Sequence, residues 1–244
     1  GCTVRYARLM LSSLSHMHQE MLNIARTSGL RIAVGTIAGA LAAVLANALI
    51  AFNRLHPDVT VELQEGTSAD LLEGLQSGVL DLALCRTSVA KRTDIFHFEW
   101  LHAEEVAVAV SPMHALSGTR CVSWKQVVQY PWILFPGDMP LRTLLEREAA
   151  SNGVVLGLRP VETASTFATA LLLNKSPEMV ALMSLETLEF FEARGTVVRL
   201  DLKVQANAEP YGIVTRAGAT QSDVLAAFKD CIRRQALSAV RRGH

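Results

Sequence analysis

Small and hydroxyl-bearing residues stand directly after several predicted strands of this chain, at points where a helix begins. Backbone N–H groups in the first turn of a helix lack intrahelical partners, and together with hydroxyl groups they suit a carboxylate or another small anion. Each helix start stabilises a negative charge by only about 0.3–1 kcal/mol, so several must act together. The residues of this type that we expect to contact a ligand are Thr36, Ala38, Gly39, Thr67, Ser68, Thr163, Ser165 and Thr166. Several of them are equally ordinary helix caps, and that alternative stays open.

A cation and an aromatic ring complete this set of candidate binding residues. Arg86 follows a predicted strand directly and is the best candidate for a charge partner to an anionic ligand. It could equally be a rim arginine paired with Asp94 or Glu65. Phe135 ends another predicted strand and is expected either to wall the pocket or to lie in the core.

The sequence gives little support for catalysis or metal binding. The sequence contains no GxSxG elbow, HExxH motif, P-loop or dinucleotide-binding glycine loop in place. The four cysteines are scattered without metal-ligand spacing, so neither a structural zinc nor any other cofactor is expected. We therefore predict a binding protein rather than an enzyme.

The elements that must position these residues alternate between strand and helix. Residues 30–84 predict strand, helix, strand, helix and strand, and two successive βαβ units require a parallel sheet. The carboxyl ends of such strands are where open α/β sheets bind ligands. A second alternation follows after Ser111 and Pro112, and a polar stretch at 205–210 leads back to a last strand and helix.

This pattern predicts an α/β fold of two Rossmann-like lobes joined by two crossover strands, with a ligand cleft between them. We expect lobe I to comprise residues 29–112 and 208–244, and lobe II to comprise residues 113–207. Such a clamshell binds a small molecule by closing around it.

The first 28 residues have a different pattern. Apolar residues recur there at alternating spacings of three and four from Val4 to Ala25, which is typical of a coiled-coil seam. We expect a partial linker or dimerisation helix over residues 1–28, whose upstream part is not in this sequence. A helix folded back on its own domain is the alternative.

Composition excludes some classes of function. The chain has 244 residues, of which 50% are hydrophobic, and its 23 basic and 23 acidic side chains give a net charge of zero. A surface that grips nucleic acid by itself needs a basic excess to displace counterions, so direct DNA binding by these residues is not expected. No apolar run reaches the roughly 20 uncharged residues of a membrane span.

The chain resembles the linker helix and effector-binding domain of LysR-type transcriptional regulators. The specific parts are the linker register, the F-x-x-x-x-P-x-V-x-x-x-L stretch from Phe52 to Leu63, and the L-x-x-G-x-x-D-L-A-L stretch from Leu75 to Leu84. The resemblance implies a regulatory domain similar to periplasmic binding proteins, an N-terminal helix-turn-helix that binds promoter DNA, and self-association as dimers or tetramers. It also implies effector contacts at Thr36 and the following turn, Thr67, Ser68, Arg86, Phe135 and the turn from Thr163 to Thr166.

Two departures from the family pattern fall on one wall of the expected cleft. The usual glycine-rich turn is replaced by residues 174–178, and the proline that commonly follows the next strand is Ser184. The identity of the effector therefore cannot be transferred from the family.

The leading hypothesis is a cytoplasmic sensor domain that binds a small, anionic metabolite between its lobes and so modulates promoter binding by a DNA-binding domain missing from this sequence. A solute-binding protein of a transport system shares the clamshell and is the alternative. An enzyme on the same scaffold is the third hypothesis.

Overall fold

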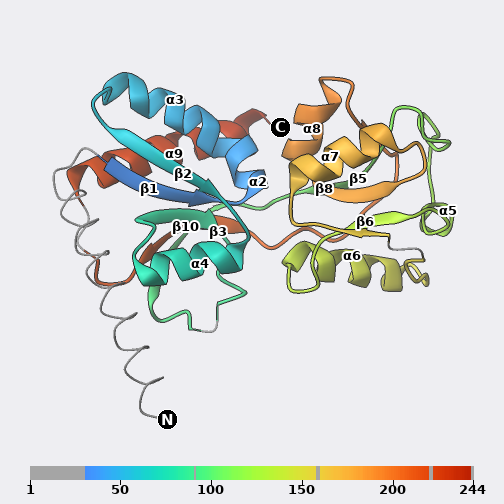
Figure 1. The fold of residues 1–244 in the computed structure, drawn as a ribbon, viewed down its shortest axis with the longest axis horizontal. Helices are drawn as coiled ribbons and strands as arrows, with labels where there is room; N and C mark the ends of the chain where they lie inside the picture. The colour runs from blue at the N-terminus through green and yellow to red at the C-terminus, as the bar shows by residue number, and fades with distance from the viewer. Residues whose placement is uncertain (1–30, 91, 158–159, 220–221, 243–244) are drawn as a thin grey trace, which may run out of the picture.

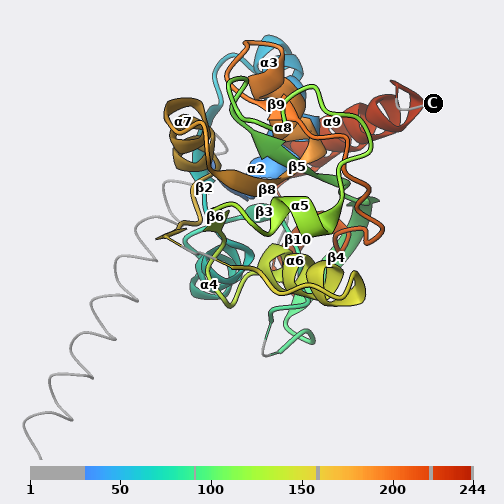
Figure 2. The same cartoon turned by 90° about the vertical axis from the view of Figure 1, so that its right-hand side faces the viewer.

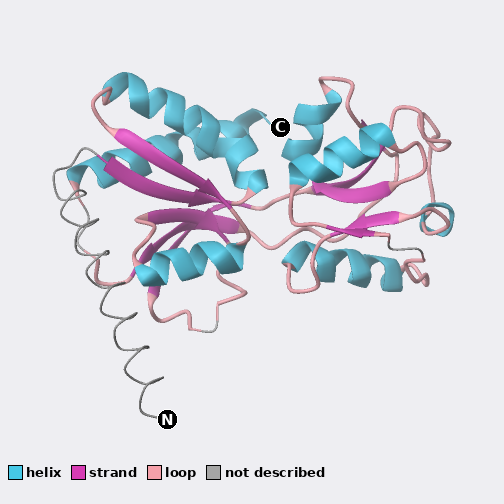
Figure 3. Ribbon diagram, in the orientation of Figure 1, coloured by secondary structure: helices cyan, strands magenta, loops and turns pink. Residues whose placement is uncertain are grey.

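Two five-stranded mixed sheets, each with helices on both faces, lie side by side (Figures 1 and 3). The computed structural model describes residues 31–90, 92–157, 160–219 and 222–242. The predicted linker helix over residues 1–28 lies outside the described residues. We call the lobe with the first sheet lobe I and the other lobe II; Figure 2 views the molecule from the side of lobe II.

Lobe I has the strand order β2-β1-β3-β10-β4. Strand β1 pairs in parallel with β2 and β3, whereas β10 is antiparallel to both β3 and β4. The elements of lobe I are β1 (Arg31–Thr36), α2 (Ala38–Ala40), the π-helical stretch η1 (Leu41–Leu45), α3 (Ala46–Leu55), β2 (Thr60–Glu65), α4 (Ser68–Ser77), β3 (Leu82–Cys85), β4 (Phe96–His102), β10 (Tyr211–Arg216) and α9 (Asp223–Arg242).

Lobe II has the strand order β7-β6-β8-β5-β9. Strand β6 pairs in parallel with β7 and β8, and β5 is antiparallel to β8 and β9. The elements of lobe II are β5 (Val106–Val110), α5 (Trp124–Val127), β6 (Trp132–Leu134), α6 (Pro140–Ser151), β7 (Val161–Glu162), α7 (Thr166–Lys175), β8 (Val180–Ser184), α8 (Leu185–Glu192) and β9 (Val198–Arg199).

The chain crosses between the lobes at a different point from the one predicted. Lobe I was predicted to extend to residue 112, but β5 pairs with β8 and β9 of lobe II, so the first crossing falls at residues 103–105. The prediction is wrong because β5 is continuously apolar and its sequence fits the middle of either sheet. The second crossing runs through residues 209–210 into β10, and the Ala208 N–H donates to the Glu104 carbonyl at 3.2 Å, which holds the two crossings together.

Each lobe has its own hydrophobic core. In lobe I, Phe52 and Phe228 pack edge to face with ring centroids 4.9 Å apart, which joins α3 to α9. In lobe II, β5 contributes to a core on each side of its sheet because neighbouring strand residues point to opposite faces. Val108 and Val110 lie in the cluster with Trp132, and Ala107 and Ala109 in the other. The lobes are therefore packed independently.

The long helix from Ala38 to Leu55 is apolar and long enough to cross a membrane by composition alone. One such helix is weak support for a membrane span. Its buried residues Val44, Ala48 and Phe52 are fully covered within lobe I. This contact is what a core helix of an α/β lobe requires.

Candidate functional site

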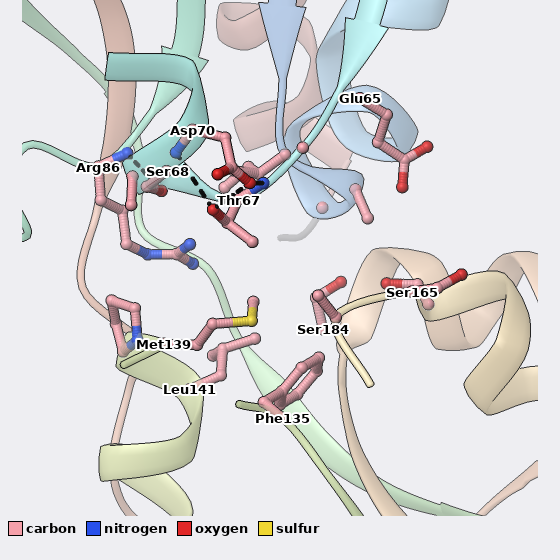
Figure 4. Close-up of a pocket in the computed structure, with 18 of the residues that line it drawn as sticks. Glu65, Thr67, Ser68, Asp70, Arg86, Phe135, Met139, Leu141, Ser165 and Ser184 are labelled. Atoms are coloured by element: carbon pink, nitrogen blue, oxygen red, sulfur yellow. Dashed lines mark hydrogen bonds between the residues drawn. The ribbon is translucent and has the colours of Figure 1, made fainter. Parts of the chain in front are cut away.

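A cavity of about 420 Å³ lies between the lobes, where the carboxyl ends of their parallel strands meet (Figure 4). This is the position at which open α/β sheets bind ligands. Lobe I and the first crossing contribute Ile37, Ala38, Gly39, Glu65, Gly66, Thr67, Ser68, Ala69, Asp70, Arg86, Val89 and Glu104. Lobe II contributes Phe135, Asp138, Met139, Pro140, Leu141, Ala164, Ser165, Thr166, Phe167 and Ser184.

The start of α4 brings a closed set of hydrogen bonds to the lobe I wall. The Thr67 hydroxyl accepts from the Asp70 N–H at 3.2 Å, and the Asp70 carboxylate accepts from the Thr67 N–H at 3.3 Å and from its hydroxyl at 2.7 Å. This reciprocal arrangement is a capping box, which the Thr-x-x-Asp spacing encodes. The Ser68 hydroxyl accepts from the Arg86 N–H at 3.2 Å and so ties the end of β3 to α4.

Arg86 and Glu104 form a buried ion pair in the pocket. Their side chains are 6% and 2% exposed, and Nη2 of Arg86 donates to Oε2 of Glu104. Nε of Arg86 donates to the Glu209 carbonyl at 2.9 Å, so the guanidinium is bound to both crossing segments. Burial lowers the pKa of Arg86 from its ordinary value, while the charge of Glu209 opposes the shift. The alternative in which Arg86 pairs with Asp94 or Glu65 is wrong. Asp94 pairs with Arg92, and the guanidinium of Arg86 is bonded to Glu104 and to the Glu209 carbonyl.

Gly39 leaves room for the Glu104 carboxylate at the start of the Ala38–Leu55 helix. A Cβ atom at Gly39 would collide with Oε1 of Glu104 and would lie 3.3 Å from Oγ of Ser184. The Glu104 carboxylate thus lies beside the positive end of this helix as well as against Arg86.

The lobe II wall is mostly apolar. Phe135, Met139 and Leu141 lie together opposite Thr67 and Ser68 in the close-up (Figure 4). Phe135 also belongs to the lobe II core, so this ring both lines the cavity and packs in the core. The hydroxyl of Ser165 accepts from the Ala168 N–H at 3.2 Å and caps α7.

Eight of the ten predicted site residues line the cavity, and two do not. The eight are Ala38, Gly39, Thr67, Ser68, Arg86, Phe135, Ser165 and Thr166. Thr36 is fully buried and does not line the cavity; its hydroxyl donates to the Ile37 carbonyl at 3.0 Å. The Thr163 hydroxyl accepts from the Ser165 N–H at 3.1 Å, in the turn before α7. Both threonines were expected in the cavity because they end strands, but local backbone bonds hold their side chains elsewhere.

Glu104, Asp138 and Asp70 line the cavity although they are not among the residues predicted from the sequence. Glu104 lies in the first crossing, and placing that crossing at residues 111–112 hid its role. Ser184 was noted only as a departure from the family; its hydroxyl lies 2.7 Å from that of Thr187 at the start of α8. Among the residues that the structure describes, no group of three or more His, Cys, Asp or Glu side chains could hold a metal ion.

The geometry defines a class of protein: a two-lobed α/β binding domain with a small-molecule pocket between its lobes. Residues 25–237 match the family described as the LysR substrate binding domain. The chain belongs to this family, which consists of transcriptional regulators.

Curated relatives and solved structures agree with this membership. The chain is 29% identical over 226 residues to the transcriptional regulator GalR of Pseudomonas putida, covering 93% of this chain and 55% of GalR. It is 23% identical over 214 residues to GbpR of Azospirillum brasilense, covering 87% of this chain and 62% of GbpR. The chain therefore spans about 55–62% of the length of these relatives.

Two solved structures show the same fold with effectors bound. The effector-binding domain of QuiR in complex with shikimate superposes with a TM-score of 0.70 at 20% identity, covering 85% of this chain and 97% of that one. The regulatory domain of CcmR from Synechocystis in complex with 2-PG gives 0.69 at 16% identity, covering 84% and 96%. The periplasmic-binding-protein-like architecture expected from the sequence is confirmed.

Proposed function

We propose that this chain is the sensor part of a DNA-binding transcriptional regulator and that a small-molecule effector bound in the interlobe cavity changes how the whole protein binds its promoter. The observation that carries this proposal is the cavity at the carboxyl ends of the strands of both lobes. A ligand there contacts both lobes at once. Relatives that share the family are regulators, and structures with the same fold hold shikimate or 2-PG.

The two crossing segments are the elements through which a ligand would act. Arg86 is bonded to Glu104 in the first crossing and to the Glu209 carbonyl in the second, so a ligand that disturbs this arginine also changes the contacts between lobes. A ligand shifts such an equilibrium only by its differential affinity for the two lobe arrangements. A 100-fold preference corresponds to about 2.7 kcal/mol.

The remaining assignments follow from family membership and complete the proposal. Promoter DNA is contacted through a helix-turn-helix domain outside this sequence, the chain self-associates as a dimer or tetramer, and the protein is cytoplasmic. It performs no catalysis. A solute-binding protein of a transport system would share the fold, but the regulators among the relatives favour the sensor.

A blocked cavity tests the proposal. Ala164 lines the cavity and is exposed, so Ala164→Trp should fill the space without disturbing a core. Genomic DNA fragments bound by the full-length protein are selected first, and their affinity is then measured by mobility shift with and without metabolite extract. We expect extract to change the affinity of the parent protein and not of Ala164→Trp.

The matched control is Ala150→Trp, which places the same side chain on an exposed position of α6 outside the cavity. This variant should respond to extract as the parent does. An equal response from Ala164→Trp would contradict effector binding in the cavity.

A further inference from the structure

The cavity already contains an anion of its own, the Glu104 carboxylate. It is bonded to Arg86, and it lies where a Cβ atom of Gly39 would otherwise stand, at the start of the Ala38–Leu55 helix. A cation and a helix start are the two features that would attract an anionic ligand. Glu104 occupies both of them.

At two other helix starts in the cavity, a side chain of the chain accepts from a backbone N–H group of the first turn. At α4, Thr67 and Asp70 satisfy each other's backbone N–H groups, and Asp70 adds a negative charge there. At α7, Ser165 accepts from the Ala168 N–H. The first residue of α6 is Pro140, which has no N–H to offer. These side chains therefore reduce the positive potential that the helix starts offer to a ligand.

The charges that line the cavity are mainly negative. Arg86 is the single cationic side chain among the lining residues that the structure describes, against the carboxylates of Glu65, Asp70, Glu104 and Asp138. Glu65 and Asp138 are exposed, so they repel an approaching anion from the rim. The cavity therefore opposes a carboxylate ligand, contrary to the expectation from sequence.

The polar and apolar walls match a molecule with hydroxyl groups on a carbon ring. A guanidinium donates only and a carboxylate accepts only, so a ligand that binds beside Arg86 and Glu104 needs both acceptors and donors at neighbouring positions. Phe135, Met139 and Leu141 on the opposite wall require apolar surface. Hydroxyl groups on adjacent ring carbons satisfy both walls.

We propose that the effector is a polyhydroxylated ring compound of monosaccharide size that carries no carboxylate, bound with its hydroxyl groups beside the Arg86–Glu104 pair and its ring carbons against Phe135. This inference rests on the proposed function and adds the chemical class of the ligand. The cavity volume of about 420 Å³ lies in the range for small-molecule sites.

Matched pairs of compounds test the class. Glucose, galactose and inositol are titrated into the 244-residue chain by calorimetry, alongside glucuronate and galacturonate, which carry a carboxylate on the same ring. We expect at least one neutral member to bind about tenfold more tightly than its acid. An acid that binds as tightly as its neutral counterpart overturns the proposed class.

A failure of the class and a failure of the proposed function give different results. If none of the neutral compounds binds but metabolite extract still changes DNA affinity through the cavity, the class is wrong and the sensor function stands. If extract also has no effect, both are wrong.

Variants identify Glu104 as the group that sets the preference. Glu104→Gln keeps the shape and frees the Arg86 charge, so the preference for the neutral sugar over its acid should fall or reverse. Because this buried variant could unfold, the exposed double variant Glu65→Gln/Asp138→Asn is measured as well, with a smaller shift of the same sign expected. Glu73→Gln on the exposed face of α4, outside the cavity, is the matched control and should leave the preference unchanged. No shift in either cavity variant would contradict the proposal.

Discussion

The two lobes share one strand order but line their common cavity with different chemistry. In each lobe, three parallel strands (β2-β1-β3 and β7-β6-β8) are extended by two strands, of which the first is antiparallel to the third parallel strand. That antiparallel strand, β10 or β5, is in both cases the one that follows a crossing. The same three strand ends therefore face the cavity from each side.

The residues at equivalent strand ends differ in kind. After β3, lobe I places Arg86 in an ion pair, whereas in lobe II the last residue of β8, Ser184, is the N-cap of α8. After the outermost parallel strand, β2 or β7, lobe I has the capping box of Thr67, and lobe II has the single cap of Ser165. The topology thus fixes where side chains meet, and the individual residues make lobe I the polar wall and lobe II the apolar wall.

The largest expected effect comes from removing one partner of the ion pair that distinguishes lobe I. Glu104→Leu leaves the buried Arg86 charge unpaired, so the free energy of unfolding should fall by about 3–5 kcal/mol. The double variant Arg86→Met/Glu104→Leu removes both charges and should recover most of that loss. Urea denaturation of the parent and the variants measures both differences.

The exposed pair Arg92–Asp94 provides the control for this comparison. Both of its side chains are about two-thirds exposed, and Arg92→Ala should leave the denaturation midpoint nearly unchanged. A loss for Glu104→Leu as small as that for Arg92→Ala would show that the buried pair contributes nothing specific.

Most of the fold could be predicted from the sequence because the alternation of strands and helices determines parallel sheets. Residues 30–84 form the predicted β1, β2 and β3 in one sheet. The crossing was misplaced because pairing between distant strands decides it. A continuously apolar strand such as β5 carries no sign of which sheet it joins.

The sequence predicts which turns of the main chain reach the cavity better than it predicts which side chains point into it. Turns at strand ends reach the cavity because the topology places them there, so Ala38, Gly39, Thr67 and Ser165 line it. The direction of a side chain depends on local hydrogen bonds, which turned Thr36 away from it. The partner of Arg86 depends on a tertiary contact with Glu104 that no local pattern encodes.

A moderate effect is expected where the two lobes cap equivalent helices. Thr67→Ala removes the hydroxyl that accepts from the Asp70 N–H in the capping box, in which the Asp70 carboxylate also accepts from the Thr67 N–H. Ser165→Ala removes the single hydrogen bond from the Ala168 N–H. Each should lower the free energy of unfolding by about 1 kcal/mol, with the larger loss at Thr67. Denaturation of the two variants side by side compares the caps, and an equal or larger loss at Ser165 would contradict the advantage of the capping box.

The smallest expected effect is a pH dependence of the free energy of unfolding that comes from a histidine in lobe II. His114 of lobe II is buried, and its Nδ1 accepts from the Leu116 N–H at 3.0 Å. Burial lowers the pKa of His114 below its ordinary value, an effect that Glu178 partly opposes. Between the folded pKa and the unfolded value of about 6.5, the unfolded chain binds more protons, so stability is lost as the pH falls through this window. His114→Gln keeps an acceptor for Leu116 but cannot titrate. The decrease in urea midpoint from pH 7.5 to 5.5 should therefore be smaller in the variant than in the parent, and equal decreases would assign the acid sensitivity to other groups.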